Sequence, residues 1–146
     1  MRTYIRKFGR DQYETLVVEA LVACGYEVTL STGFQDERLG VDVWDTETGI
    51  AWDLLMGPQC GERYQEKVWK HDGRVAVLCI PISLIEDLRL CVGTKSPRLR
   101  NVLTKLDQIY SEALAEVKLS PKALTLAQAQ QLEVAWQQGY RRRLAA

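Results

Sequence analysis

This chain of 146 residues has one histidine, no closely spaced cysteines and no long apolar run. The single histidine, His71, excludes mechanisms that need two histidines and metal sites rich in histidine. The four cysteines are spread along the chain, at Cys24, Cys60, Cys79 and Cys91. Because none belongs to the CxxC pair of a zinc or redox motif, we expect reduced thiols in the protein core.

No segment has the composition of a membrane anchor or a secretion signal. The longest apolar run, Val75 to Ile82, is less than half of the roughly 20 residues that span a bilayer. The start of the chain is basic, but acidic residues follow where a signal peptide would have an apolar stretch. We therefore expect a cytoplasmic protein with no membrane partner.

An excess of one charge is also missing, since 19 lysines and arginines balance 19 aspartates and glutamates. This balance neither requires nor excludes a nucleic-acid partner. Basic residues nevertheless collect at the two ends of the chain, as Arg2, Arg6, Lys7 and Arg10 and as Arg141, Arg142 and Arg143. These ends either bind phosphate groups or are ordinary solvated charges.

The length and a hydrophobic content of 47% fit one globular domain over residues 1–146. Helical spacing of apolar residues predicts helices over residues 11–24 and 61–71. Alternating or continuous apolar residues predict strands over residues 26–31, 41–45, 50–56 and 74–80. Residues 33–40 are predicted to form a polar loop bounded by glycines, which either contacts a ligand or is a solvated connection. The predicted fold class is α/β.

Residues 82–146 are predicted to form a helical extension of this fold. Ser96-Pro97 and Ser120-Pro121 each have the pattern of a helix N-cap with proline in the first turn. In the last predicted helix, apolar residues recur at helical spacing, at Ala129, Leu132, Trp136 and Tyr140. Such a stripe is typical of a packing surface, and it makes this extension a candidate for forming a homodimer.

The strands over 41–45 and 50–56 carry the main functional indication. They are joined by the turn-forming residues TETG, which predict a β-hairpin in which Asp45 flanks Ile50. Asp42 then faces Asp53, and a tighter two-residue turn gives the same register. Directly opposed side chains have Cβ atoms about 4.5–5.5 Å apart, so the two carboxylates would lie side by side.

Two opposed carboxylates require a neighbouring cation, a raised pKa or full exposure to solvent. A divalent metal ion fits oxygen ligands of this kind, and Mg²⁺ or Mn²⁺ is the expected ion. It would stabilise charge on a scissile phosphate and lower the pKa of the attacking water. The same pattern has no function if both acids lie on an uncovered sheet face, or if the strands pair in another register.

The order of predicted elements over residues 9–81 resembles the αβββαβ core of the PD-(D/E)XK nucleases, which include restriction endonucleases and Holliday-junction resolvases. The resemblance implies a restriction-endonuclease-like core with a mixed central sheet and metal-dependent hydrolysis of DNA or RNA. Asp42, in the sequence GVD, matches the family's first aspartate, and Asp53 matches the acid of its (D/E)xK motif. Both would be metal ligands by this resemblance. Glu14 matches the acid of the first helix, with Glu19 as a second candidate.

The chain departs from the family pattern at the motif's lysine, because the position two residues after Asp53 is Leu55. Some members of the family carry this basic group on the following helix. Lys67 is the best candidate there, because on a helical wheel it lies on the face of that helix that meets the sheet. The alternative is a lysine that only covers apolar surface with its stem. His71, at the end of the same helix, is predicted to be structural.

Three functions are consistent with these patterns. The first is a metal-dependent nuclease with Asp42, Asp53, Lys67 and Glu14 as catalytic residues and Asp42 and Asp53 holding the metal. The second is a catalytically degenerate protein of the same fold that binds nucleic acid or a protein partner. The third is an unrelated α/β interaction module whose hairpin acids face solvent.

Overall fold

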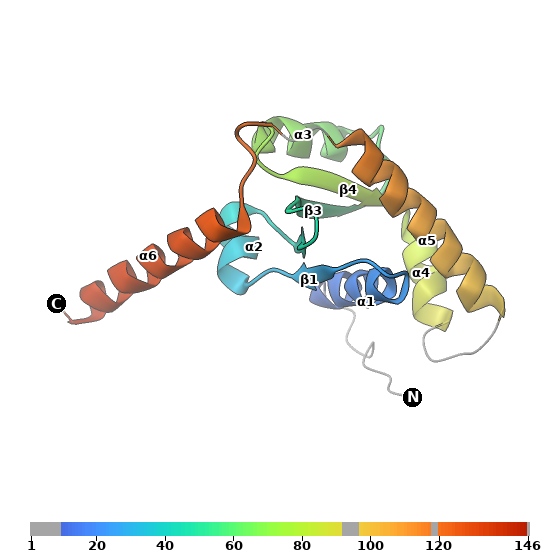
Figure 1. Ribbon diagram of the computed structural model, residues 1–146, viewed down its shortest axis with the longest axis horizontal. Helices are drawn as coiled ribbons and strands as arrows, with labels where there is room; N and C mark the ends of the chain where they lie inside the picture. The colour runs from blue at the N-terminus through green and yellow to red at the C-terminus, as the bar shows by residue number, and fades with distance from the viewer. Residues whose placement is uncertain (1–9, 92–96, 118–119, 146) are drawn as a thin grey trace.

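The computed structural model describes residues 10–91, 97–117 and 120–145, which form an α/β fold (Figure 1). The first half of the chain contains α1 (Arg10–Ala23), β1 (Val28–Leu30), α2 (Gly33–Leu39), β2 (Val43–Asp45), β3 (Ala51–Met56), α3 (Glu62–His71) and β4 (Ala76–Ile80). The second half is helical, with α4 (Ile82–Cys91), α5 (Pro97–Glu116) and α6 (Leu126–Ala145). The α/β class predicted from the sequence is confirmed.

The four strands form one mixed sheet in the order β1-β2-β3-β4. The first three strands are antiparallel, whereas β4 runs parallel to β3. The register of the hairpin is the predicted one, because Val43 pairs with Trp52 and Trp44 pairs with Ala51. The printed pairing ends at Val43 and Trp52, and the Asp42 N–H also donates to the Trp52 carbonyl at 2.8 Å, so Asp42 lies just beyond the regular pairing.

Alternation along the strands separates two apolar layers. Val43 and Trp52 belong to the larger core, which α1, α4 and α5 complete on one face of the sheet. Trp44 and Ala51 belong to a smaller core on the other face, together with Val75 and residues that lead into α6. Asp53 has the same parity as Ala51 on β3, so its side chain leaves the sheet on the smaller-core face.

One predicted loop is wrong, because residues 33–40 contain the helix α2. Its start is fixed by a capping box, in which the Gln35 N–H donates to Thr32 Oγ1 at 3.2 Å and the Thr32 N–H donates to Gln35 Oε1 at 3.1 Å. Its end is fixed by Gly40, whose φ of 71° lies in the left-handed region. Charged residues between two glycines had suggested a solvated loop, but the local hydrogen bonds favour a helix.

The last helix also begins later than predicted. Residues 121–122 form a turn, and α6 starts at Leu126. Thr125 provides its cap, since Thr125 Oγ1 accepts from the Gln128 N–H at 3.1 Å. From there α6 extends away from the rest of the molecule (Figure 1).

Two further observations concern the cysteines and the apolar character of the helices. The four cysteines are free thiols, but Cys60 is exposed and therefore does not belong to the core as predicted. Among the described residues, no helix is both long enough and apolar enough to span a membrane.

Candidate metal centre

Asp42 and Asp53 lie side by side at the open end of the β2–β3 hairpin. The backbone N–H of Asp42 donates to the Trp52 carbonyl at 2.8 Å, and the Leu54 N–H donates to Asp42 Oδ2 at 2.7 Å. The two side chains are hydrogen-bonded to each other. They are only 2% and 5% exposed. The alternative of two acids on an uncovered, solvated sheet face is therefore wrong.

Two more acids reach Asp42 from other elements. Glu14 comes from the buried side of α1 and Asp36 comes from α2. Oxygen atoms of Glu14, Asp36 and Asp42 all lie within 4.8 Å of one another. Oxygens on opposite sides of one Mg²⁺ ion are about 4 Å apart, so small side-chain rotations bring these three atoms to coordinating distance.

Asp36 is the residue that the sequence patterns did not identify, because it falls in the segment predicted to be a loop. The capping box of α2 turns the following residue, Asp36, toward Asp42, with which it is hydrogen-bonded. Gln35 also accepts from Trp44 Nε1 at 3.0 Å, which ties α2 to the sheet. The spacing of Thr32 and Gln35 was the signal that could have revealed this helix.

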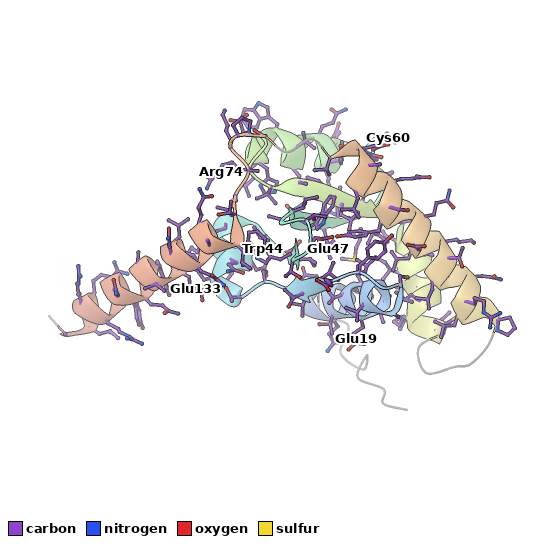
Figure 2. The ribbon with its side chains drawn as sticks, in the orientation of Figure 1. Glu19, Trp44, Glu47, Cys60, Arg74 and Glu133 are labelled. Carbon is purple, nitrogen blue, oxygen red and sulfur yellow. The ribbon has the colours of Figure 1, made fainter. Side chains whose placement is uncertain are left out.

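Glu14 and Glu19 are distinguished clearly by their positions on α1. Glu14 is 7% exposed and lies at the cluster, whereas Glu19 is exposed on the outer side of the helix (Figure 2). Of the two candidates from the first helix, only Glu14 is brought to the other acids.

Crowding of acids changes the protonation of Asp42. Burial raises its pKa, and hydrogen bonds with Asp36 and Asp53 and the charge of Glu14 raise it further, to about 9. Only the Leu54 N–H opposes this rise. Without a cation, Asp42 is therefore protonated at neutral pH and donates a hydrogen bond to a neighbouring carboxylate.

Asp53 has the opposite behaviour, because basic groups surround its oxygens. Burial alone would raise its pKa, but hydrogen bonds from His71 and Lys67 outweigh burial and lower the pKa to about 2. Lys67 Nζ lies 3.1 Å from Oδ1 and 2.9 Å from Oδ2. His71 Nε2 lies 2.7 Å from Oδ2. Asp53 is thus ionised and holds the lysine that the sequence favoured.

The position of Lys67 follows from α3, which places Lys67 and His71 one turn apart on the face that meets the sheet. The Lys67 side chain is 20% exposed and ends at Asp53, so it does more than cover apolar surface. Leu55 is buried two residues beyond Asp53, where the family motif has lysine. In this chain, Lys67 reaches Asp53 from α3.

His71 is more closely tied to the site than its position at a helix end suggested. It is 7% exposed, and its ring packs against Gly40. A Cβ on residue 40 would lie 2.8 Å from His71 Cε1, and the φ of 71° at this position further disfavours a side chain. Glycine at position 40 therefore leaves room for the contact between His71 and Asp53.

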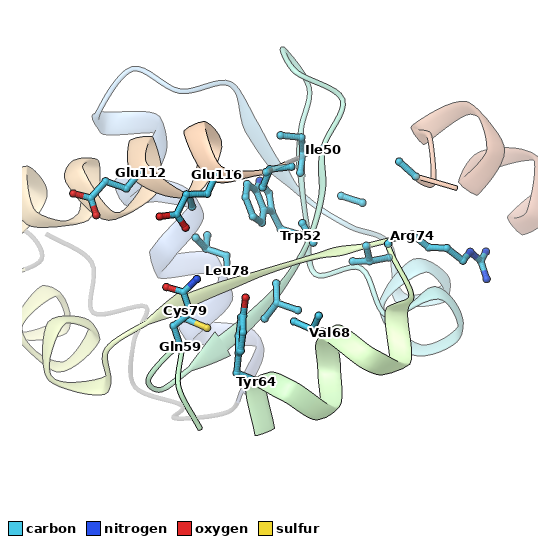
Figure 3. A pocket seen from close by; sticks show the side chains of 18 of the residues that line it. Ile50, Trp52, Gln59, Tyr64, Val68, Arg74, Leu78, Cys79, Glu112 and Glu116 are labelled. Atoms are coloured by element: carbon cyan, nitrogen blue, oxygen red, sulfur yellow. The ribbon is translucent and has the colours of Figure 1, made fainter. Parts of the chain in front are cut away.

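A hollow on the described part of the chain lies away from these acids. It has a volume of about 490 Å³ and runs beside β4, between α3 and α5. Figure 3 shows Tyr64 and Val68 on one side of it and Glu112 and Glu116 on the other. None of the four clustered acids lines it. The chemistry of the side chains, and not the size of a cavity, therefore identifies the candidate centre.

Comparison with known proteins finds no match of any kind: no family profile, no curated protein and no solved structure is detectably similar to this chain. Function must therefore be inferred from the site itself. Its defining features are four acids, which come from α1, α2, the residue before β2 and β3, and one lysine on α3.

Proposed function

We propose that this chain is a metal-dependent nuclease of the PD-(D/E)XK type, which hydrolyses phosphodiester bonds of DNA or RNA with Mg²⁺ or Mn²⁺. The observation that carries the proposal is the convergence of Glu14, Asp36 and Asp42 next to Asp53, whose carboxylate holds Lys67. A restriction-endonuclease-like core over residues 9–81 is part of the same proposal. The order of α1, the strands, α3 and β4 supports it.

The donor set fits a hard divalent cation. Such ions prefer carboxylate oxygens, and three oxygens within 4.8 Å of one another can surround one ion after small movements. Asp53 borders the set through its hydrogen bond with Asp42. A carboxylate has about four acceptor positions, so Asp53 can contact the cation while it binds Lys67 and His71. We therefore keep Asp53 with Asp42 as a metal ligand and add Glu14 and Asp36.

A cation in this place would stabilise charge on the scissile phosphate and lower the pKa of the attacking water. The protein's own groups have separate tasks. Asp42 would give up its proton to hold the metal, because a bound cation favours the ionised carboxylate over the shared hydrogen bond. Lys67 neutralises phosphate charge and orients the water, and Asp53 and His71 keep its ammonium in position.

A second function is a degenerate domain that binds nucleic acid or a protein without cleaving. One specific observation favours it, since both oxygens of Asp53 already contact Lys67 and residue 55 is leucine. In that case the ion pair would be structural. Binding of nucleic acid would then be independent of metal, and no cleavage would be found.

Cleavage of a labelled plasmid and of single-stranded DNA and RNA, with Mg²⁺, Mn²⁺ or EDTA, tests the proposal. We expect metal-dependent cleavage that Asp42→Asn reduces by about a thousandfold or more, since metal contributes several kcal/mol to such reactions. Asp87→Asn is a matched control, because Asp87 lies on α4 in an exposed ion pair with Arg98. Cleavage that survives Asp42→Asn, or none with either metal, would contradict the proposal.

A further inference from the structure

The helix α6 carries a row of stacked aromatic rings that the proposed nuclease centre does not use. Phe34 of α2 packs against Trp136 with ring centroids 5.6 Å apart, and Trp136 stacks on Tyr140 at 5.7 Å with an angle of 13°. The guanidinium of Arg38 lies 5.5 Å from the Trp136 ring centre. The row ends at Tyr140, which is 47% exposed.

Basic residues continue the surface beyond the last ring. Arg141, Arg142 and Arg143 are all exposed, and the chain has no acidic residue after Glu133. Tyr140 and Arg143 are three residues apart on α6 and therefore lie on the same side of the helix. Within the described residues, the ion pairs of the structure do not include these arginines. A flat exposed ring thus stands beside uncompensated positive charge.

Hydrogen bonding fixes α6 relative to the acidic cluster. Thr32, which caps α2, donates from Oγ1 to Glu133 Oε1 at 2.8 Å, and Figure 2 shows Glu133 where α6 meets α2. Phe34 and Arg38 lie one turn apart on one side of α2, whereas Asp36 projects from the opposite side. The aromatic row and the acids are therefore separated by the width of one helix, about 10–12 Å.

We propose that α6 binds an unpaired segment of nucleic acid, with a base stacked on Tyr140 and phosphates held by Arg141, Arg142 and Arg143. This proposal rests on the proposed nuclease function, whose substrate it specifies as nucleic acid with a single-stranded region. Aromatic rings beside a positive surface are the usual means of binding single strands, because every base has a flat face. A strand held at α6 needs to cross only α2 to reach the acids.

Charge decides between nucleic acid and a second copy of the chain as the occupant of this surface. Leu132, Trp136, Tyr140 and Leu144 form an exposed stripe that two α6 helices could bury against each other. A parallel pairing would bring six arginines together, and an antiparallel pairing would leave three at each end, while each α6 offers only one acid, Glu133, which is hydrogen-bonded to Thr32. Phosphates supply the missing negative charge.

Fluorescence anisotropy in EDTA tests the proposal without turnover. The probes are labelled single-stranded oligoadenylates of roughly 12 nucleotides, as DNA and as RNA, and a DNA strand of the same length with abasic sites. We expect Tyr140→Ala to weaken binding of the base-bearing strands about tenfold and to leave the abasic strand unchanged, whereas Tyr140→Phe stays within about twofold of the wild type. A loss with only one sugar class would support the proposal and assign the natural ligand to that class.

A second variant tests the charges. Replacing Arg141, Arg142 and Arg143 together by Gln should weaken all strands and reduce the salt dependence of log K by up to about 2. An equal effect of Tyr140→Ala on base-bearing and abasic strands, or no effect, would overturn the proposal. So would a dimer, measured by light scattering, that Tyr140→Ala dissociates. Circular dichroism melts check that each variant folds.

The failures of the two proposals are distinguishable. If strands bind through Tyr140 in EDTA but no metal-dependent cleavage occurs, only the nuclease proposal falls. If Asp42→Asn abolishes cleavage but Tyr140→Ala does not change the binding of single strands, only the proposal for α6 is contradicted.

Discussion

The two ends of the β2–β3 hairpin each bury a carboxylate, but the surroundings differ. At the turn, Asp45 is 2% exposed and accepts from Tyr110 Oη at 2.6 Å and from the N–H groups of Glu47 and Thr48 at 3.1 and 2.8 Å. At the open end, Asp42 is equally buried but meets the side chains of Asp36 and Asp53 and the charge of Glu14.

The difference separates a structural acid from the acid to which we assign a function. Neutral donors satisfy Asp45, so its burial contributes to stability through ordinary hydrogen bonds. Crowded acids do the opposite, because like charges in a buried place raise the free energy of the fold unless a proton or cation joins them. The open end brings acids from α1, α2, β3 and the residue before β2 to one place, which is the basis of the proposed cation site, and the turn has no such cluster.

The largest expected effect on stability comes from replacing Asp45, and it tests this comparison of the two acids directly. Asp45→Ala removes the acceptor of three donors and should lower the free energy of unfolding by about 2–4 kcal/mol. Asp42→Asn should change it by less than about 1 kcal/mol without metal, because the amide resembles the protonated acid. Urea denaturation of both variants measures the difference. Equal losses would mean that Asp42 is also structural.

Much of this hairpin could be predicted from sequence. Alternating apolar residues and the turn TETG placed both strands, and the pairing of Val43 with Trp52 followed whatever the exact turn type. Asp36 could not be found in this way, because its contact with Asp42 depends on how α2 packs and not on local spacing. The ion pair of Lys67 could be predicted only in part. A helical wheel showed that Lys67 faces the sheet, but it could not show that Asp53 is its partner.

The next effect concerns Lys67 on α3, to which we assign the catalytic basic group. Lys67→Gln should reduce metal-dependent cleavage by about 100-fold, since one positioned electrostatic donor is typically worth this factor. Lys70→Gln is the matched control, because Lys70 is exposed on the same helix and should change cleavage less than about twofold. Initial rates at saturating metal measure both. A loss with Lys70→Gln alone would contradict the assignment.

A smaller effect is expected at Gly40, which borders the open end through His71. Gly40→Ala adds a Cβ 2.8 Å from His71 Cε1 at a backbone φ of 71°. The change should cost about 1–3 kcal/mol of stability, from left-handed strain and displacement of the ring. Thermal melts compare it with Gly33→Ala, where a Cβ meets nothing within 4 Å. Similar losses in both variants would argue against a close contact.

The smallest expected effect is the pH dependence of the stability and of the metal affinity. Because the pKa of Asp42 is raised to about 9, its contribution to the stability of the metal-free protein is fully present below about pH 4 and is lost as pH rises toward 9. Asp53, with a pKa of about 2, contributes in the opposite sense, and its contribution is lost as pH falls toward 2.

Metal binding should displace the proton of Asp42, so the affinity for Mn²⁺ should rise about tenfold per pH unit between about pH 6 and pH 8.

Calorimetry in two buffers with different ionisation enthalpies measures the proton released on binding Mn²⁺. About one proton per ion is expected near neutral pH. The Asp42→Asn variant should release none from this position. Binding that is independent of pH would show that the acids are already ionised without metal.

The most direct test of the central claim is a thermal melt of the wild type and of Asp42→Asn, each with EDTA and with millimolar Mn²⁺. At a concentration about 100 times the dissociation constant, a bound ion adds about 2.7 kcal/mol, which raises the Tm of a domain of this size by roughly 5–10 °C. We predict this rise for the wild type and none for Asp42→Asn, although both melt alike in EDTA. No rise in the wild type, or the same rise in the variant, would contradict a metal centre at the open end of the hairpin.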